Sequence, residues 1–184
     1  MKLKKEGLVF RITLLGMCLA LFIVLNFASF YITPSIKFSF KSLPIIFISV
    51  VYGPWYGALL GLVGEFFCQL TSAYGLAPTT PLWILPWVAQ GLIVGFLFKQ
   101  KNAREHKIRW IITIVIACLS VSILNTFALW VDFKIQGYSK IFLKLNIVGR
   151  IINSVVSMIV NALLIPVFFE PLIKQGKFET ENQQ

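Results

Sequence analysis

Long apolar stretches alternate with short polar ones along the chain, and this alternation predicts its elements. At roughly twenty residues per membrane crossing, six stretches are candidate transmembrane helices: residues 8–30, 39–52, 55–70, 82–98, 111–131 and 149–173. We therefore predict an all-α membrane protein. Its six-transmembrane-helix bundle would occupy residues 1–174 as one domain, followed by a polar tail in residues 175–184.

The second stretch needs a separate argument because it is short and contains Pro44. It can cross only if it extends back through Lys41 and Lys37, whose long side chains would reach the membrane interface. We expect its bend at Pro44. The following Gly53-Pro54 break suits a tight join between two antiparallel helices.

Composition supports a membrane protein, since 58% of the residues are hydrophobic and only 13% are charged. The net charge of +10 would suggest nucleic acid in a soluble protein, but Lys and Arg lie at the ends of apolar stretches. They act there as topology signals and favour no nucleic-acid partner. With the amino terminus inside, the outward segments hold six of the 17 Lys and Arg and the inward segments hold the other eleven, which favours two cytoplasmic termini. The six are Lys37, Lys41, Lys134, Lys140, Lys144 and Arg150.

The residue types argue against an enzyme. The three cysteines, Cys18, Cys68 and Cys118, are isolated in apolar runs, which is typical of packing rather than of a metal site or disulfides. There is no HExxH, G-x-S-x-G or GxxxxGK[ST] motif, and the chain has only seven acids. An energy source must therefore lie in another subunit or an ion gradient.

Small residues recur at helical spacing in three places. Gly53, Gly57 and Gly61 leave one side of the third helix almost bare, and Gly91 and Gly95 do the same on the fourth. We interpret both as close packing within the bundle rather than as dimerisation surfaces. A separate pair on the first helix, Gly16 and Ala20, is either internal packing or an exposed notch for a partner protein.

Glu65 is the acid that interrupts an apolar stretch. An ionised residue at a helix centre costs about 2.5–3.5 kcal/mol to insert, so such residues face an interior or a cavity. The assigned topology places Glu65 and Gln69 in the outer half of the third helix. Two readings stay open: both residues reach an outward-facing pocket, or a protonated Glu65 is hydrogen-bonded within the bundle.

The fourth stretch combines aromatic and amide groups. Trp83 and Trp87 are four residues apart and share a helix face, with Gln90 one turn further along. This arrangement suits a flat polar ring, although Trp83 could also be an ordinary interfacial anchor. Further polar candidates are Asn125, Trp130, Arg150, Asn153 and Asn161. Arg150, at an outer helix end, could meet a carboxylate ligand through two hydrogen bonds or anchor the helix.

The stretch KSLPIIFISVVYGPWYGALLGLVGEFF carries a family resemblance. Its Gly-Pro turn, glycine series and closing acid, together with six short helices, resemble the substrate-binding S components of energy-coupling factor (ECF) transporters. The resemblance is strongest from Lys41 to Phe98. The closing acid is commonly Asp in such proteins and is Glu65 here. The segment SAYGLAPTTPLWILP also departs from the folate-type pattern.

The resemblance implies a high-affinity binding subunit in the plasma membrane of a bacterium. It would capture a water-soluble vitamin or related micronutrient, of folate, pantothenate, pyridoxine or pyrimidine type, under the first outer loop and the segment from Tyr74 to Trp83. Lys41 and Tyr74 thereby join the candidate contacts, with helices four to six as walls. Gly16 and Ala20 match the motif that docks on the membrane scaffold (T) subunit. ATP and Mg would be used by two partner ATPases (A and A′), with no cofactor on this chain.

Two alternatives stay open from the sequence. One is a non-transporting membrane scaffold of the cell-shape protein type, which should lack a polar outer pocket. The other is a stand-alone proton-coupled carrier that uses Glu65.

Overall fold

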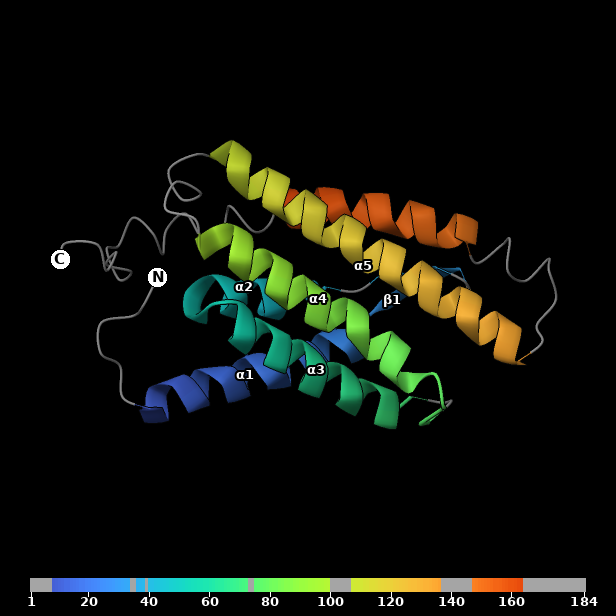
Figure 1. The fold of residues 1–184 in the computed structure, drawn as a ribbon, viewed down its shortest axis with the longest axis horizontal. Coiled ribbons are helices and arrows are strands. Elements are labelled where there is room, and N and C mark those ends of the chain that lie inside the picture. Colours follow the sequence, from blue (N-terminus) through green and yellow to red (C-terminus); the bar gives the residue numbers. More distant parts are fainter. Residues whose placement is uncertain are drawn as a thin grey trace.

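The computed structural model describes residues 8–33, 36–38, 40–72, 75–99, 107–136 and 147–163. These residues form six α-helices and one two-stranded antiparallel ribbon (Figure 1). The helices are α1 (Leu8–Phe27), α2 (Ser42–Tyr52), α3 (Pro54–Leu70), α4 (Thr80–Lys99), α5 (Lys107–Gln136) and a sixth helix, Ile147–Leu163. The ribbon strands are β1 (Phe30–Thr33) and β2 (Ile36–Phe38).

The helical membrane bundle predicted from the sequence is confirmed, with the ribbon as an addition. Among the described residues, three helices are long and apolar enough to cross a membrane: Leu8–Phe27, Thr80–Phe98 and Trp110–Ile135. Ser42–Tyr52 and Ile147–Leu163 are shorter apolar helices. In Figure 1, α1, α3, α4 and α5 follow one another across the bundle, and the sixth helix, in orange to red, lies beside α5. The start of α1 and the end of the sixth helix lie at the same end of the bundle, as an even number of crossings requires.

The prediction for the second helix is wrong in two respects. α2 begins only at Ser42 and does not extend back through Lys37, because Lys37 belongs to strand β2 of the ribbon. Lys41 is buried rather than directed to the membrane interface. Pro44 lies in the first turn of α2, where a helix has no backbone hydrogen bond for its missing N–H to break, so no bend is needed there.

The glycines of α3 and α4 let the two helices pack with their backbones in contact. A Cβ on Gly61 would lie 2.5 Å from the carbonyl oxygen of Trp87, and a Cβ on Gly91 would overlap the backbone of Gly57. A Cβ on Gly64 would lie 2.6 Å from the ring of Phe22 on α1. The predicted internal packing is confirmed at these positions. Gly53 has φ 96°, which a side chain would strain, and it makes the tight turn between α2 and α3.

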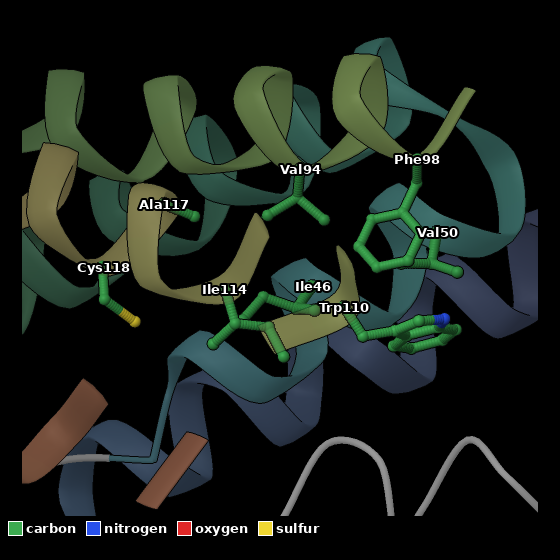
Figure 2. Packing of buried hydrophobic residues seen from close by; sticks show 8 residues of the cluster. All are labelled: Ile46, Val50, Val94, Phe98, Trp110, Ile114, Ala117 and Cys118. Carbon is green, nitrogen blue, oxygen red and sulfur yellow. The ribbon is translucent and has the colours of Figure 1, made fainter. Parts of the chain in front are cut away.

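An apolar cluster fills the end of the bundle where α2 and α4 finish and α5 begins (Figure 2). The rings of Phe98 and Trp110 meet edge to face with centroids 4.6 Å apart. Its other members are Ile46, Val50, Val94, Ile114, Ala117 and Cys118. A second cluster joins α1 to the bundle through Phe22, Ile45, Leu60 and Trp87, among others. The first cluster closes one end of the bundle. The polar residues gather between this cluster and the opposite end of the bundle.

Candidate functional site

A cavity of about 240 Å³ opens between the helices at the other end of the bundle. Side chains from the start of α2, from α3, α4, α5 and the sixth helix line it. Eight of the ten residues predicted as substrate contacts are among them: Lys41, Glu65, Trp83, Trp87, Gln90, Asn125, Arg150 and Asn153. Residues scattered over 112 positions of sequence thus surround one space, which is the arrangement that a ligand site needs.

Two of the predicted contacts are not in the lining. Gln69 lies one turn from Glu65 and donates a hydrogen bond to it instead of facing the cavity. Tyr74 lies outside the described residues. Of the other polar candidates, Trp130 and Asn161 do not line the cavity either, although Asn161 Nδ2 approaches the sulfur of the lining residue Cys118 at 3.9 Å.

Six lining residues were missed in the sequence analysis: Ser42, Cys118, Val121, Ser122, Ser154 and Ser157. A helical-spacing signal was present for most of them. Cys118, Val121, Ser122 and Asn125 recur at intervals of three or four on α5, and Arg150, Asn153, Ser154 and Ser157 do so on the sixth helix. Single serines in apolar helices carry little signal by themselves, because their hydroxyls often bond the preceding turn.

Three helices line the cavity over the same length. The lining runs from Trp83 to Gln90 on α4, from Asn125 to Cys118 on α5 and from Arg150 to Ser157 on the sixth helix. The first and last residues of each run are seven positions apart and hence about 10 Å apart along the helix axis. Arg150 contacts both Trp83 and Asn125, so these three residues form one end of the cavity. Gln90, Cys118 and Ser157 form the other end, directly above the apolar cluster.

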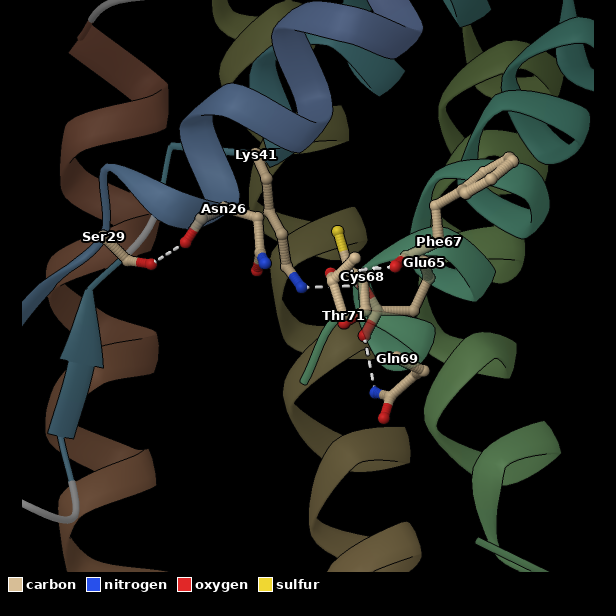
Figure 3. Close-up of polar contacts among 8 residues, drawn as sticks. All are labelled: Asn26, Ser29, Lys41, Glu65, Phe67, Cys68, Gln69 and Thr71. Atoms are coloured by element: carbon tan, nitrogen blue, oxygen red, sulfur yellow. Dashed lines mark hydrogen bonds and ion pairs between the residues drawn. The ribbon is translucent and has the colours of Figure 1, made fainter. Parts of the chain in front are cut away.

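A buried ion pair forms the side of the cavity next to α3 (Figure 3). Lys41 Nζ lies 2.7 Å from Glu65 Oε2, and Gln69 Nε2 donates to Glu65 Oε1 at 2.9 Å. Both carboxylate oxygens of Glu65 therefore have partners, although the residue is only 4% exposed. Of the two readings left open by the sequence, the pocket reading holds for Glu65 but not for Gln69, and Glu65 lines the cavity as one member of a charge pair.

Lys41 also contacts the aromatic wall. Its ammonium lies 4.1 Å from the ring centroid of Trp87 and 5.6 Å from that of Phe22, within the range of cation–π attraction. The rings of Phe22 and Trp87 in turn meet edge to face at 6.1 Å. Trp87 thus joins the core of the bundle to the cavity, which explains why only 9% of its surface is exposed.

The opposite side of the cavity is cationic. The guanidinium of Arg150 lies 5.1 Å from the ring centroid of Trp83, and its Nη1 donates to the backbone carbonyl of Asn125 at 3.3 Å. No carboxylate of the described residues pairs with Arg150. Trp83 is therefore more than an interfacial anchor, because it supports the arginine that faces the cavity.

Gln90 is the most enclosed polar group of the lining. It is 0% exposed, and neither its side-chain oxygen nor its nitrogen has a hydrogen-bond partner among the described residues. Native proteins leave few such groups unsatisfied, since each costs about 1–3 kcal/mol. An unsatisfied amide that borders a cavity points to a ligand function.

Gly16 and Ala20 lie away from the cavity, on the exposed side of α1. A Cβ added at Gly16 would meet nothing within 4 Å, in contrast to those at Gly57, Gly61 and Gly64. None of the described residues would contact a Cβ at Gly16, which favours the exposed notch of the two readings of this pair. Among the described residues, no group of three or more His, Cys, Asp or Glu side chains could hold a metal ion.

Comparison with known proteins gives both a family match and structural matches. The family model described as "ECF transporter, substrate-specific component" matches residues 10–174. A solved structure of the S component of a bacterial ECF transporter superposes with a TM-score of 0.70 and 21% sequence identity. The match covers 94% of this chain and 100% of the chain of that structure. At that identity the structure is evidence for the fold alone. A search of curated proteins found no match.

Proposed function

Because this chain belongs to the family of ECF transporter substrate-specific components, we propose that its cavity captures a water-soluble vitamin or related micronutrient at the outer face of a bacterial plasma membrane. The chain itself would carry out no covalent chemistry. Capture, loop closure, docking on partner subunits and inward release would follow one another.

The polar cavity above a closed apolar cluster carries this proposal. Cations, an acid, amides and hydroxyls line one half of the bundle, while Phe98, Trp110 and Ile114 fill the other half. A bundle of this kind can accept a polar ligand from one side, but the apolar cluster leaves that ligand no path through the bundle. The positive-inside distribution of Lys and Arg supports an orientation with the open side outward. Release to the cytoplasm then needs a change in the bundle, for which partner subunits would supply the energy.

The partners would be a membrane scaffold (T) subunit and two ATPases (A and A′), with ATP and Mg bound and used by the latter. The face of α1 around Gly16 and Ala20 supports such docking, since both residues are exposed and a Cβ at Gly16 would meet no described residue within 4 Å. Small residues on an exposed helix face let another membrane helix approach closely.

The two alternative functions fit these observations less well. A membrane scaffold without transport activity has no use for a cavity with ten polar or charged residues in its described lining. A stand-alone proton-coupled carrier needs an acid that gains and loses a proton during transport. Here both oxygens of Glu65 have partners, one of them the Lys41 ammonium.

Two measurements test the proposal. Mass spectrometry of small molecules released from the gently purified chain should find one micronutrient in amounts close to that of the protein. The isolated chain in liposomes should bind this compound without accumulating it, whereas addition of the T and ATPase subunits with Mg-ATP should produce accumulation. Accumulation by the isolated chain under a proton gradient would instead establish the carrier function.

A further inference from the structure

We infer that the cavity is built for a singly charged organic acid whose flat ring carries a hydrogen-bond donor beside an acceptor. Arg150 receives the carboxylate at one end, and the side-chain amide of Gln90 pairs with the ring edge at the other. This inference rests on the proposed function, because it specifies the ligand of the same site.

The amide of Gln90 defines what the enclosed end recognises. A primary amide offers one acceptor oxygen beside two donor hydrogens, so its best partner is an edge with a donor next to an acceptor. Lactams, ureas and aminopyrimidine-type rings have such an edge. Since Gln90 is 0% exposed and has no partner among the described residues, a ligand without this edge would leave its amide buried and unsatisfied. Sites of this kind discriminate strongly against analogues that lack the hydrogen-bonding group.

The charges of the lining define the other end. Lys41 and Glu65 neutralise each other at 2.7 Å, which leaves Arg150 as the uncompensated charge among the described lining residues. A guanidinium pairs well with a carboxylate through two parallel hydrogen bonds. A single net positive charge matches a single negative charge, whereas a doubly charged phosphate ester would leave one charge without a partner in a partly desolvated site.

The dimensions limit the size of the ligand. Arg150 and Gln90 lie at opposite ends of a lining about 10 Å long, and the cavity holds about 240 Å³. This volume is slightly below the roughly 300–1,000 Å³ of sites for drug-sized ligands. One or two fused rings with a short acidic group fit this space. Trp83 and Trp87, one turn apart on α4, add aromatic surface to the lining that such a ring would contact.

Binding of matched probes to the purified full-length protein tests the inference. Uracil-6-carboxylate and pterin-6-carboxylate have both features, uracil and pterin lack the acid, and naphthalene-2-carboxylate has the acid without the ring edge. We expect at least one of the first two to bind about tenfold or more tightly than its acid-free counterpart and than the naphthalene acid. Equal binding within the set, or no binding of either two-featured probe, would overturn the inference.

Two variants assign these binding preferences to residues. Arg150→Gln should bind a two-featured probe no more tightly than the same ring without its carboxylate. Gln90→Leu should bind a two-featured probe no more tightly than naphthalene-2-carboxylate. Lys134→Gln is the matched control, because Lys134 also lies over a tryptophan ring, that of Trp130, but outside the cavity. It should leave all preferences unchanged. Preferences that survive the Arg150 and Gln90 substitutions would contradict the assignment.

The ligand-free stability of Gln90→Leu separates a binding function from a structural one. A glutamine kept for ligand binding is a buried, unsatisfied group without ligand, so its replacement by leucine should maintain or raise the melting temperature. If Gln90 instead supports the fold, its replacement by leucine should lower the melting temperature. The identity of the retained compound separates this inference from the proposed function. A neutral or cationic micronutrient would overturn the inference alone, whereas a chain that retains nothing and supports no uptake with its partners would overturn both.

Discussion

Lys41 Nζ lies 2.7 Å from Glu65 Oε2, and this contact joins the residue immediately before α2 to the C-terminal half of α3. It explains both a lysine that is 8% exposed and an acid inside an apolar stretch. Each charge is tolerated in the bundle because the other is present. The pair also holds the segment after the ribbon against the wall of the cavity, so it connects the stability of the bundle to the site.

Removal of one member of this pair should be costly. Glu65→Gln leaves a buried ammonium without its countercharge, and we expect the free energy of unfolding in detergent to fall by about 3–5 kcal/mol. Replacement of both residues, Lys41→Met with Glu65→Leu, should restore most of this stability, because no charge then stays buried alone. Chemical denaturation followed by tryptophan fluorescence measures both.

Lys134→Met is the matched control for that experiment. Lys134 Nζ lies 4.1 Å from the ring centroid of Trp130, the same distance as that of Lys41 from Trp87, but Lys134 is exposed. Its replacement should change stability by less than about 0.5 kcal/mol. If Glu65→Gln costs no more than this control, the ion pair does not stabilise the bundle.

Trp83 should be the cleaner probe of ligand binding among the two cavity tryptophans. Trp83→Ala removes a ring face and the support of the Arg150 guanidinium, and we expect affinity for the compound retained by the purified protein to fall by about 1–2 kcal/mol. Trp87→Ala should also weaken binding, but Trp87 packs against Phe22, so that variant should lose about 3–5 kcal/mol of stability as well.

Trp55→Ala provides the comparison for Trp83→Ala in isothermal titration of the same compound. Trp55 is 73% exposed, and its ring contacts that of Phe96 on the outside of the bundle. Its removal should leave affinity unchanged. Equal affinities of the Trp83 and Trp55 variants would exclude Trp83 from the site.

Gly16→Leu should separate docking from folding. Because a Cβ at Gly16 meets no described residue within 4 Å, we expect unchanged thermal stability and unchanged ligand binding. Copurification with the T subunit should fall several-fold, because the leucine keeps the partner helix from approaching α1. Quantitative pull-down from membranes that contain all subunits measures this loss.

Gly64→Leu is the contrasting variant, because Gly64 on α3 packs against Phe22 of α1. Its side chain would overlap Phe22, so this variant should lose about 1–3 kcal/mol of stability or more before any effect on docking. Recovery of the full complex with Gly16→Leu at the wild-type level would argue against α1 as the docking face.

The orientation of the bundle can be tested directly. Epitope tags at both ends should be inaccessible to antibodies in intact cells and accessible after permeabilisation, since the distribution of Lys and Arg favours cytoplasmic termini. A single cysteine at Leu76, an exposed residue between α3 and α4, should react with a membrane-impermeant maleimide from outside. Tags exposed on opposite sides of the membrane would contradict an even number of crossings.

The sequence by itself determined the class of the protein and much of one wall of its site. Apolar length predicted the helices, and four-residue spacing placed Trp83 and Trp87 on one face with Gln90 a turn further along. The glycines of α3 and α4 predicted close packing. These conclusions were accessible because they depend on helical periodicity, which relates residues near one another in sequence.

Only the tertiary structure decided which distant residues meet. Lys41 was expected at the membrane interface and instead neutralises Glu65, 24 positions away. The serines of α5 and the sixth helix gained significance when Ser122 and Ser154, 32 positions apart, proved to be hydrogen-bonded to each other in the lining of the cavity. The physical reason is that the cost of a buried polar group depends on the partner that the fold brings to it. Periodicity identifies the face of a helix that turns inward, whereas the relative placement of the helices determines what that face contacts.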